Sequence, residues 1–245
     1  LKVHGVAGFA KKLMKKAEEY KNRPYPYTRW YPKHMPSQAE LEKQRGQSFA
    51  YDPLISIVIP LYNTPQQYLK ELLDSVQAQT YGKFQLCLAD GSDNGDVEAY
   101  IREHYGNEKR FVYHRLEEND GISRNTNEAI KIAEGDFIMF SDHDDTLAPN
   151  ALYEIVKELN DYPETDVVYT DEDKVTMDGK RYYDPHFKPD FNLDMLRCNN
   201  YICHIFVVKR EIVDQVGLLR KEYDGAQDFD FVLRCCEKAH RIGHV

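Results

Sequence analysis

The sequence lacks any apolar run long enough to span a membrane. It also lacks a C-x-x-C pair, and its five cysteines are an odd number, which suits no closed disulfide framework. Cys87 and Cys203 lie in apolar, strand-like runs. This placement predicts small buried side chains in a protein of a reducing compartment. An excess of positive charge is missing too, because the formal net charge is −9. These absences predict a cytoplasmic protein that has no chain-wide nucleic-acid surface.

The residues that are present fit a soluble globular protein of 245 residues, of which 42% are hydrophobic and 30% are charged. That length accommodates one large domain or two small ones with a sizeable core. The first residue is Leu1 and not Met, as in a piece of a longer polypeptide.

The first 50 residues differ in pattern from the rest and form an N-terminal helical and extended segment. Apolar residues recur at helical spacing over residues 6–20 beside several lysines, which predicts a short basic amphipathic helix. Such a helix either lies on an anionic membrane surface, as a peripheral contact, or packs against its own domain or a neighbouring one. The pattern further predicts an extended aromatic linker over residues 23–32 and a short helix over residues 37–44.

From residue 53 onward, strand-like and helix-like patterns alternate, which specifies an α/β fold with a mostly parallel sheet between helices. Strands are predicted over residues 55–60, 84–89, 111–113, 136–140, 167–170 and 201–209. Helices are predicted over residues 64–79, 97–105, 122–133, 150–159, 210–216 and 229–239. The first of these helices has Thr64 as its expected N-cap and Pro65 at its first position. Residues 171–200 are expected to form loops and short elements.

A strand-like apolar run ends at Phe140 and is followed by three carboxylates, Asp142, Asp144 and Asp145. Ligands bind open α/β sheets beyond the carboxyl ends of such strands. Carboxylates crowded there repel one another unless a cation lies between them, and Mg²⁺ or Mn²⁺ takes oxygen ligands and bridges to phosphates. The alternative is a solvated acidic loop or helix start.

Polar residues also follow three other predicted strands. Pro60, Tyr62 and Asn63 follow the first, residues 90–93 the second, and residues 170–174 the fifth. If the sheet is parallel, these ends and the acidic cluster share one edge and outline a pocket. Asp-Gly-Ser within residues 90–92 is by itself only a turn signature.

Two predicted helix starts carry charged residues that allow two interpretations each. Residues 121–125 open a helix whose free N–H groups, with Arg124, would attract an anion, whereas Arg124 alone could be a surface arginine. Asp228 stands where the last helix begins, either as its cap or as a general base aimed at the pocket.

Together these segments resemble the family 2 inverting glycosyltransferases with the A-type nucleotide-sugar-binding fold, from about residue 53 to the C-terminus. The resemblance is carried by SIVIPLYN at residues 56–63, SVQAQTY at 75–81, GISRN at 121–125, GDFI at 135–138 and the D-x-D motif at 142–144. Residues 169–174, 188–190, 200–202 and 225–230 further resemble bacterial members that build O-antigen, capsule, cell-wall rhamnan or protein-linked glycans.

The resemblance implies a single Rossmann-like domain over residues 51–245, with a nucleotide-binding half at about 53–146 and an acceptor-binding half at about 147–245. It implies a UDP- or dTDP-linked sugar donor, an Mn²⁺ or Mg²⁺ ion, and an acceptor that is a saccharide, a lipid-linked saccharide or a glycoprotein. Whether the protein forms a homo-oligomer is left open by the resemblance. The implied reaction is one in-line displacement that inverts the anomeric carbon.

Roles follow from the resemblance position by position. Asp90 would accept a hydrogen bond from the pyrimidine, in a pocket lined by Pro60 and Tyr62. Asp144 would bind the metal and Asp228 would be the base. Further nucleotide contacts are implied for Asn63, Ser92, Arg124 and Asp142, the last shared between ribose and metal, with Asp145 in support. Weaker candidates for acceptor contacts are Asp171, Glu172, Asp190, Asn200, His204 and Asp230, the last being also the next candidate for the base.

The sequence departs from the family pattern in two places. One acid, Asp90, follows the second strand where the family usually has two. The chain also stops at Val245, before a C-terminal segment with a histidine that related enzymes often use near the diphosphate, so a C-terminal truncation is an expectation.

Two other functions compete with this interpretation. Residues 142–146 match the D-x-D-x-T motif of haloacid-dehalogenase-type phosphatases, in which Asp142 would attack phosphate. That family places the motif on its first core strand, whereas three predicted strands precede it here. A non-catalytic relative within a glycosyltransferase assembly is the other alternative, against which the intact acidic cluster and Asp228 argue.

Overall fold

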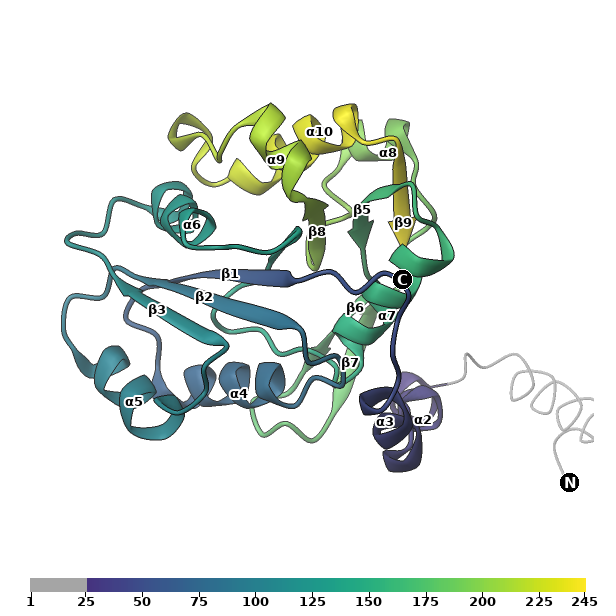
Figure 1. The fold of residues 1–245 in the computed structure, drawn as a ribbon, viewed down its shortest axis with the longest axis horizontal. Coiled ribbons are helices and arrows are strands. Elements are labelled where there is room, and N and C mark those ends of the chain that lie inside the picture. The colour runs from purple at the N-terminus through teal and green to yellow at the C-terminus, as the bar shows by residue number, and fades with distance from the viewer. Residues whose placement is uncertain (1–25) are drawn as a thin grey trace, which may run out of the picture. The chain divides into compact units, whose positions relative to one another are not determined.

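A computed structural model describes residues 26–245 of the chain (Figure 1). The predicted basic helix over residues 6–20 lies outside the described residues. The chain divides into a larger compact unit, Pro36–Glu172 with His186–Val245, and a smaller one, Leu1–Met35 with Asp173–Pro185. Within the described part, no helix has both the length and the apolar character that crossing a membrane requires.

The larger unit contains a seven-stranded sheet in the order β3-β2-β1-β4-β8-β5-β9. Its strands are β1 (Ile55–Leu61), β2 (Phe84–Asp90), β3 (Phe111–Arg115), β4 (Phe137–Phe140), β5 (Thr165–Tyr169), β8 (Phe206–Lys209) and β9 (Arg241–His244). β1 runs parallel to β2 and β4, β2 parallel to β3, and β5 parallel to β9. β8 is antiparallel to both β4 and β5, so β4 and β5 share one direction. The predicted α/β fold with a mostly parallel sheet is confirmed.

Helices cover both faces of this sheet (Figure 1). Successive residues of a strand point to opposite faces, so Ile57 and Val58 of β1 belong to two different buried clusters. The first cluster is packed by α4 (Gln66–Gln77), α5 (Asp96–Tyr105) and α7 (Ala151–Asp161). The second is packed by α6 (Ile122–Lys131), α8 (Leu193–Cys198), α9 (Arg210–Val216) and α10 (Gln227–Lys238). This double burial explains why the strand sequences are almost continuously apolar.

The predicted helix starts are met in one case and missed in another. The short helix predicted over residues 37–44 is confirmed as α3 (Gln38–Arg45), and the structure adds a capping box in which Ser37 and Glu40 exchange hydrogen bonds. The predicted cap of α4 is wrong, because that helix begins at Gln66 with Pro65 as an N-cap that lacks a side-chain hydrogen bond. The Thr64 hydroxyl lies instead 2.7 Å from Nδ1 of His143, in the acidic loop.

In the smaller unit, the predicted extended aromatic linker is wrong, because most of its described residues are helical. Tyr27–His34 form the helix α2, which accommodates Pro32. Tyr27 stacks on Trp30 at 5.6 Å between ring centroids, and Tyr31 stacks on Tyr182 at 3.9 Å. Tyr182 belongs to β7 (Tyr182–His186), which pairs with β6 (Glu172–Val175). Ring stacking at helical spacing therefore outweighs the extended preference that the prolines suggested.

The predicted strand over residues 201–209 is wrong in its first half, because β8 includes only Phe206–Lys209. The backbone carbonyls of Ile202 and His204 accept hydrogen bonds from the Lys188 side chain, so they do not join a strand ladder. The short strand β9 and the 3-10 helix η1 (Lys221–Tyr223) were not predicted.

Candidate active site

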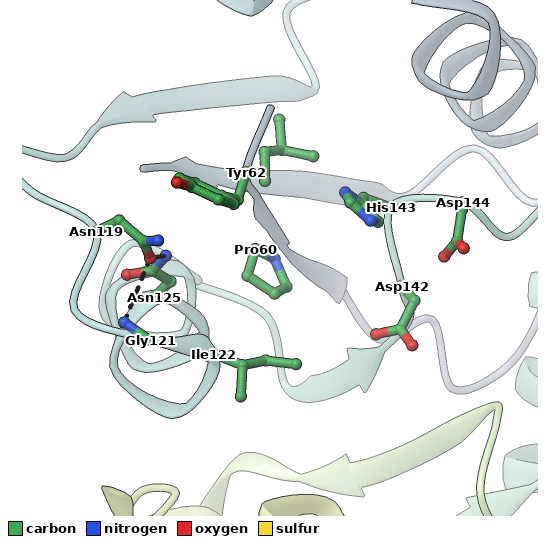
Figure 2. A pocket seen from close by; sticks show the side chains of 10 residues that line it. Pro60, Tyr62, Asn119, Gly121, Ile122, Asn125, Asp142, His143 and Asp144 are labelled. Carbon is green, nitrogen blue, oxygen red and sulfur yellow. Dashed lines mark hydrogen bonds between the residues drawn. The ribbon is translucent and has the colours of Figure 1, made fainter. Parts of the chain in front are cut away.

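The polar strand ends meet at one edge of the sheet, as parallel strands require. A cavity of about 260 Å³ opens there (Figure 2). Figure 2 shows three segments around it: the end of β1, the start of α6 and the loop after β4. Its walls are formed by Pro60, Leu61, Tyr62, Asn119, Gly121, Ile122, Asn125, Asp142, His143 and Asp144. Four of the predicted site residues, Pro60, Tyr62, Asp142 and Asp144, therefore line one cavity.

The ends of β1 and β2 are tied together beside this cavity. Asn63, with a positive φ of 48°, donates from Nδ2 to Asp93 at 2.7 Å and accepts from the Asp93 N–H at 3.1 Å. The Asn63 N–H donates to the Ser92 hydroxyl at 2.8 Å. Tyr62 donates to Asp93 at 3.3 Å. Asn63 and Ser92 thus hold the two strand ends in place, and Tyr62 forms part of the cavity wall.

Asp90 is fully buried and surrounded by hydrogen-bond donors. Its Oδ1 accepts from the Ser92 N–H at 2.9 Å and from the Ser92 hydroxyl at 2.5 Å. Its Oδ2 accepts from the Tyr113 hydroxyl at 2.5 Å and from the Arg115 guanidinium at 3.0 Å. Burial and this carboxylate raise the pKa of Tyr113. A base that reached Asp90 would have to share Oδ2 with Tyr113 and Arg115 of β3.

The start of α6 also differs in detail from the expectation. Gly121 has a φ of +89°, and a Cβ there would lie 2.9 Å from Oδ2 of Asp224. The Ser123 hydroxyl donates to the same Asp224 carboxylate. Arg124 is exposed and pairs with Asp120 at 2.6 Å. The cavity wall at this helix is thus formed by Asn119, Gly121, Ile122 and Asn125, and a carboxylate of the chain lies against the helix start.

The acidic loop contributes to a cluster that could hold a cation. Asp142, Asp145 and His204 offer ligand atoms that all lie within 4.8 Å of one another. Nε2 of His204 lies 3.2 Å from Oδ2 of Asp142. Asp144, which the sequence paired with Asp142, is exposed on the cavity wall. His204, expected at the acceptor, thus lies beside the D-x-D motif.

The charges in this cluster perturb one another. The hydrogen bond with Asp142 raises the pKa of His204 to about 11. The same contact lowers the pKa of Asp142, while burial raises that of Asp145. A cation placed between the two carboxylates would favour their charged forms.

The residues present fit a divalent metal ion. Two carboxylates and one imidazole are ligands that Mn²⁺ accepts, whereas Mg²⁺ is usually bound by oxygen. Among the described residues, Nδ1 of His204 and the buried hydroxyl of Ser141, next to Asp142, have no hydrogen-bond partner. Buried polar atoms without a partner are rare and call for a bound water or ion.

The structure also distinguishes the two predicted base candidates. Asp228 lies in the first turn of α10 and accepts a hydrogen bond from Asn200 at 2.9 Å. The N-cap of α10 is Ala226, so the alternative that Asp228 caps the helix is wrong. Asp230 accepts from Arg220 and Arg234, at 3.0 Å from each Nε. Burial favours a higher pKa for Asp230, but these arginines outweigh it and lower the pKa.

The remaining predicted acceptor residues form a network around Lys188. Asp171 accepts from the Lys188 N–H and contacts Nε2 of His244, both at 2.8 Å. His244 also lies 3.5 Å from Asp190, whose side chain is fully exposed. Glu172 lies 3.2 Å from the Lys188 ammonium. Sequence analysis assigned no role to Lys188 or His244, because each reaches Asp171 only through a long-range contact.

The family model for Glycosyl transferase family 2 matches residues 56–217. The match includes β1, the D-x-D motif and β8, and it covers most of the larger unit. The chain therefore belongs to glycosyl transferase family 2.

Curated relatives are much longer than this chain. An uncharacterized protein of Sinorhizobium fredii is 41% identical over 79% of the chain, which covers 22% of that protein. The O-antigen biosynthesis protein RfbC of Myxococcus xanthus is 36% identical over 89% of the chain, which covers 17% of that protein. The chain thus spans about a fifth of the length of these relatives.

Solved structures with the same fold include two that were determined with nucleotides. TarS of S. aureus in complex with UDP is 24% identical, with a TM-score of 0.64 over 78% of this chain and 57% of that one. A mannosyltransferase of Pyrobaculum calidifontis in complex with GDP-Man and Mn²⁺ is 18% identical, with a TM-score of 0.61 over 84% and 60%. At these identities the likeness shows the fold alone.

Proposed function

We propose that this chain carries a metal-dependent, inverting glycosyltransferase site that moves a sugar from a UDP- or dTDP-linked donor to a hydroxyl of a saccharide acceptor. The observation that carries the proposal is the shared sheet edge. There the cavity at the ends of β1 and β4 includes Asp142, which also belongs to the cluster with Asp145 and His204. A nucleotide pocket next to a diphosphate-metal site is the arrangement that a nucleotide-sugar donor requires.

The nucleotide-binding half, residues 53–146, supplies the donor contacts in this proposal. Asp90 is the acceptor for the base, and Tyr62 and Pro60 form the wall on which the base lies. Asn63 and Ser92 keep the two strand ends in register with this wall. Arg124 is exposed and precedes Asn125 of the cavity wall in the sequence, and its guanidinium would exchange Asp120 for the diphosphate.

The metal-binding part of the proposal combines the D-x-D motif with the observed cluster. Asp142, Asp144, Asp145 and His204 are the residues that would hold Mn²⁺ or Mg²⁺. Such an ion neutralises the charge that develops on a leaving nucleoside diphosphate. The remaining work falls to groups of the chain itself, which bind the donor and move one proton.

Asp228 is the proposed general base. Asn200 holds one of its carboxylate oxygens, which fixes the orientation of the group. From there Asp228 would accept the proton of the acceptor hydroxyl as that oxygen attacks the anomeric carbon. Asp230 is a poorer candidate because its carboxylate is engaged by two arginines. The acceptor half, residues 147–245, carries Asp171, Glu172 and Asp190, which would contact the acceptor.

The comparisons support the substrate class. A relative named for O-antigen biosynthesis matches most of the chain, which favours a bacterial surface glycan or a glycoprotein as the product. The UDP complex of TarS and the Mn²⁺ complex of the mannosyltransferase support a nucleotide-sugar donor and a divalent ion.

The test is transfer from a panel of nucleotide sugars in the presence of Mn²⁺, read as release of the nucleoside diphosphate with saccharide acceptors. Asp228→Asn should lower transfer about 10²- to 10⁴-fold, the usual contribution of a general base. Asp144→Ala should lower it as well, whereas Asp194→Asn, at a side chain that is 95% exposed on α8, should leave it unchanged. Full transfer by Asp228→Asn at saturating acceptor would rule out the proposed base.

The phosphatase alternative makes a different prediction in the same assay. It requires release of inorganic phosphate from simple phosphate esters, with loss on Asp142→Asn. The motif follows β4, the fourth strand along the chain, and Asp142 is paired with His204. Neither observation favours Asp142 as a nucleophile. Phosphate release by the parent chain, without transfer from any nucleotide sugar, would replace the proposed function with this one.

A further inference from the structure

A buried lysine lies next to the proposed metal cluster. The side chain of Lys188 has no exposed surface. Its ammonium donates to the backbone carbonyls of Ile202 at 2.6 Å and His204 at 2.5 Å, and to Glu172 at 3.2 Å. Three acceptors match the three N–H groups of an ammonium, so its burial is compensated. Lys188 lies in the segment between β7 and α8, whereas the carbonyls that it binds lie between α8 and β8.

The two carbonyls that Lys188 binds lie on either side of Cys203, immediately before β8. This segment is irregular, and Cys203 has a positive φ of 39°. The N–H of Ile205 lies 3.4 Å from the Thr170 hydroxyl, and the carbonyl of Ile205 accepts from the Thr170 N–H at 3.3 Å. Lys188 and Thr170 thus fix the backbone of the segment from both sides, which leaves the His204 imidazole directed at Asp142.

An imidazole in a cation site has a chemical consequence. Mg²⁺ prefers six oxygen ligands in near-ideal octahedral geometry and gives up its waters reluctantly. Transition-metal ions bind imidazole nitrogen more readily than Mg²⁺ does. Mn²⁺ has the lowest affinity in the transition-metal series but still binds it. A site built from carboxylates alone would discriminate little between Mn²⁺ and Mg²⁺. A site that includes the His204 imidazole would favour Mn²⁺.

We propose that His204 is a metal ligand that makes this site favour Mn²⁺ over Mg²⁺, and that Lys188 is the positioning residue that holds the His204 backbone for this role. The inference rests on the metal site of the proposed function and deepens it. It concerns the segment before β8, which lies outside the D-x-D motif. In the opposing interpretation, His204 is only a counter-ion for Asp142 and leaves when a metal arrives.

The first test measures Mn²⁺ and Mg²⁺ affinity of the full chain with UDP present, by electron paramagnetic resonance of bound Mn²⁺ and competition with Mg²⁺. Spin-echo modulation from a coordinated ¹⁴N reports an imidazole ligand directly. We expect the parent chain to show this modulation and His204→Asn to lose it. The variant should bind Mn²⁺ about 10- to 100-fold more weakly, with a much smaller loss for Mg²⁺. His114→Gln, at an exposed histidine of β3, should behave as the parent.

The second test addresses Lys188. Lys188→Met keeps His204 but removes the donor to both carbonyls, so the ¹⁴N modulation and the preference for Mn²⁺ should weaken about tenfold. UDP affinity measured without metal should stay within about threefold of the parent, since Lys188 does not line the cavity. If Lys188→Met fails to fold by circular dichroism, Lys188→Gln takes its place, and unchanged ¹⁴N modulation in that variant would overturn the positioning role.

Each outcome bears on a different claim. Retained ¹⁴N modulation or an unchanged Mn²⁺ to Mg²⁺ ratio in His204→Asn would overturn the ligand role. A folded Lys188→Met with full modulation would overturn the positioning role. If the parent transfers sugar but shows no ¹⁴N coupling, the inference fails while the proposed function stands. If the parent binds neither metal nor nucleotide sugar, the proposed function fails as well.

Discussion

At the scale of single residues, Asp90 is a buried carboxylate whose partners come partly from another strand of the sheet. Asp90 has no exposed surface and is held by Ser92, Tyr113 and Arg115. A buried charge of this kind is tolerated only when it is fully hydrogen-bonded. The two partners on β3 therefore fix the orientation of the Asp90 carboxylate.

This arrangement predicts the effect of removing one hydroxyl. Tyr113→Phe leaves the ring in place but removes a donor 2.5 Å from Oδ2 of Asp90. We expect the free energy of unfolding to fall by about 1–3 kcal/mol, because a buried charged acceptor loses a partner. Urea denaturation measures this change. Tyr162→Phe, at a half-exposed ring, is the control and should change it by less than about 0.5 kcal/mol. Equal effects of both substitutions would contradict the assigned role.

At the scale of elements, the turn from α5 into β3 positions those same partners. Glu108 accepts from Nε of Arg110 at 2.8 Å and from Nη2 at 2.7 Å. The Arg110 guanidinium lies over the Phe84 ring at 4.2 Å, which links the turn to β2. β3 therefore enters the sheet with its register against β2 fixed, and Arg115 pairs with Asp90 in that register.

The Glu108 pair predicts a pH-dependent stability. The hydrogen bonds from Arg110 lower the pKa of Glu108 from 4.5 to about 2. Because the folded-state pKa is lowered, the stabilisation is fully present above about pH 4.5 and is lost as the pH falls towards 2. Glu108→Gln should cost about 1–2 kcal/mol of unfolding free energy at pH 7.

The difference between Glu108→Gln and the parent should shrink as urea melts are repeated from pH 5 down to pH 3. Glu117→Gln, at an exposed loop position after β3, serves as the charge control and should show no such trend. A difference that is the same at every pH would show that the ion pair does not supply the stability.

At the scale of the whole molecule, the proposed nucleotide and metal ion would contact segments from both halves of the sequence. The cavity lies between β1, α6 and the loop after β4, while His204 comes from the segment before β8. A nucleotide and a metal bound together would therefore stabilise the larger unit as one body. At about 100 times the dissociation constant, a ligand adds about 2.7 kcal/mol.

This predicts a rise in the melting temperature of about 5–10 °C when UDP and Mn²⁺ are added together at that level. Calorimetry or dye-based thermal denaturation measures it. EDTA should remove most of the rise, because the diphosphate then lacks its bridging ion. If UDP with EDTA gives the full rise, the nucleotide binds without the metal cluster and the two sites are not coupled.

Much of this fold was predictable because its signals are local. The apolar runs of β1, β2 and β4 and the periodic helices α4, α6 and α7 all appear where the patterns placed them, within a few residues. The shared sheet edge follows from parallel pairing alone. The D-x-D motif was found for the same reason, since its position relative to β4 can be read directly in the sequence.

Other features depend on contacts that the local sequence does not contain. The mostly apolar residues 201–205 look like a strand, but the Lys188 ammonium binds two of their carbonyls. Asp90 gains Tyr113 and Arg115 only through the register of β2 against β3. β9 is short and partly polar, and its pairing with β5 supplies what its own pattern lacks. The residues that sequence analysis missed are thus those whose role depends on long-range pairing.

The reversed direction of β8 has a consequence for how such a site can diversify. The neighbouring strands β4 and β5 leave the sheet at the ligand edge, whereas β8 enters the sheet there. A loop that precedes a strand can change its side chains without altering the exits of β1 and β2. Substitutions over residues 199–205 could therefore retune the ion chemistry while the nucleotide pocket is conserved. An engineer could exploit this separation by exchanging the segment before β8 between chains that share the first three strands.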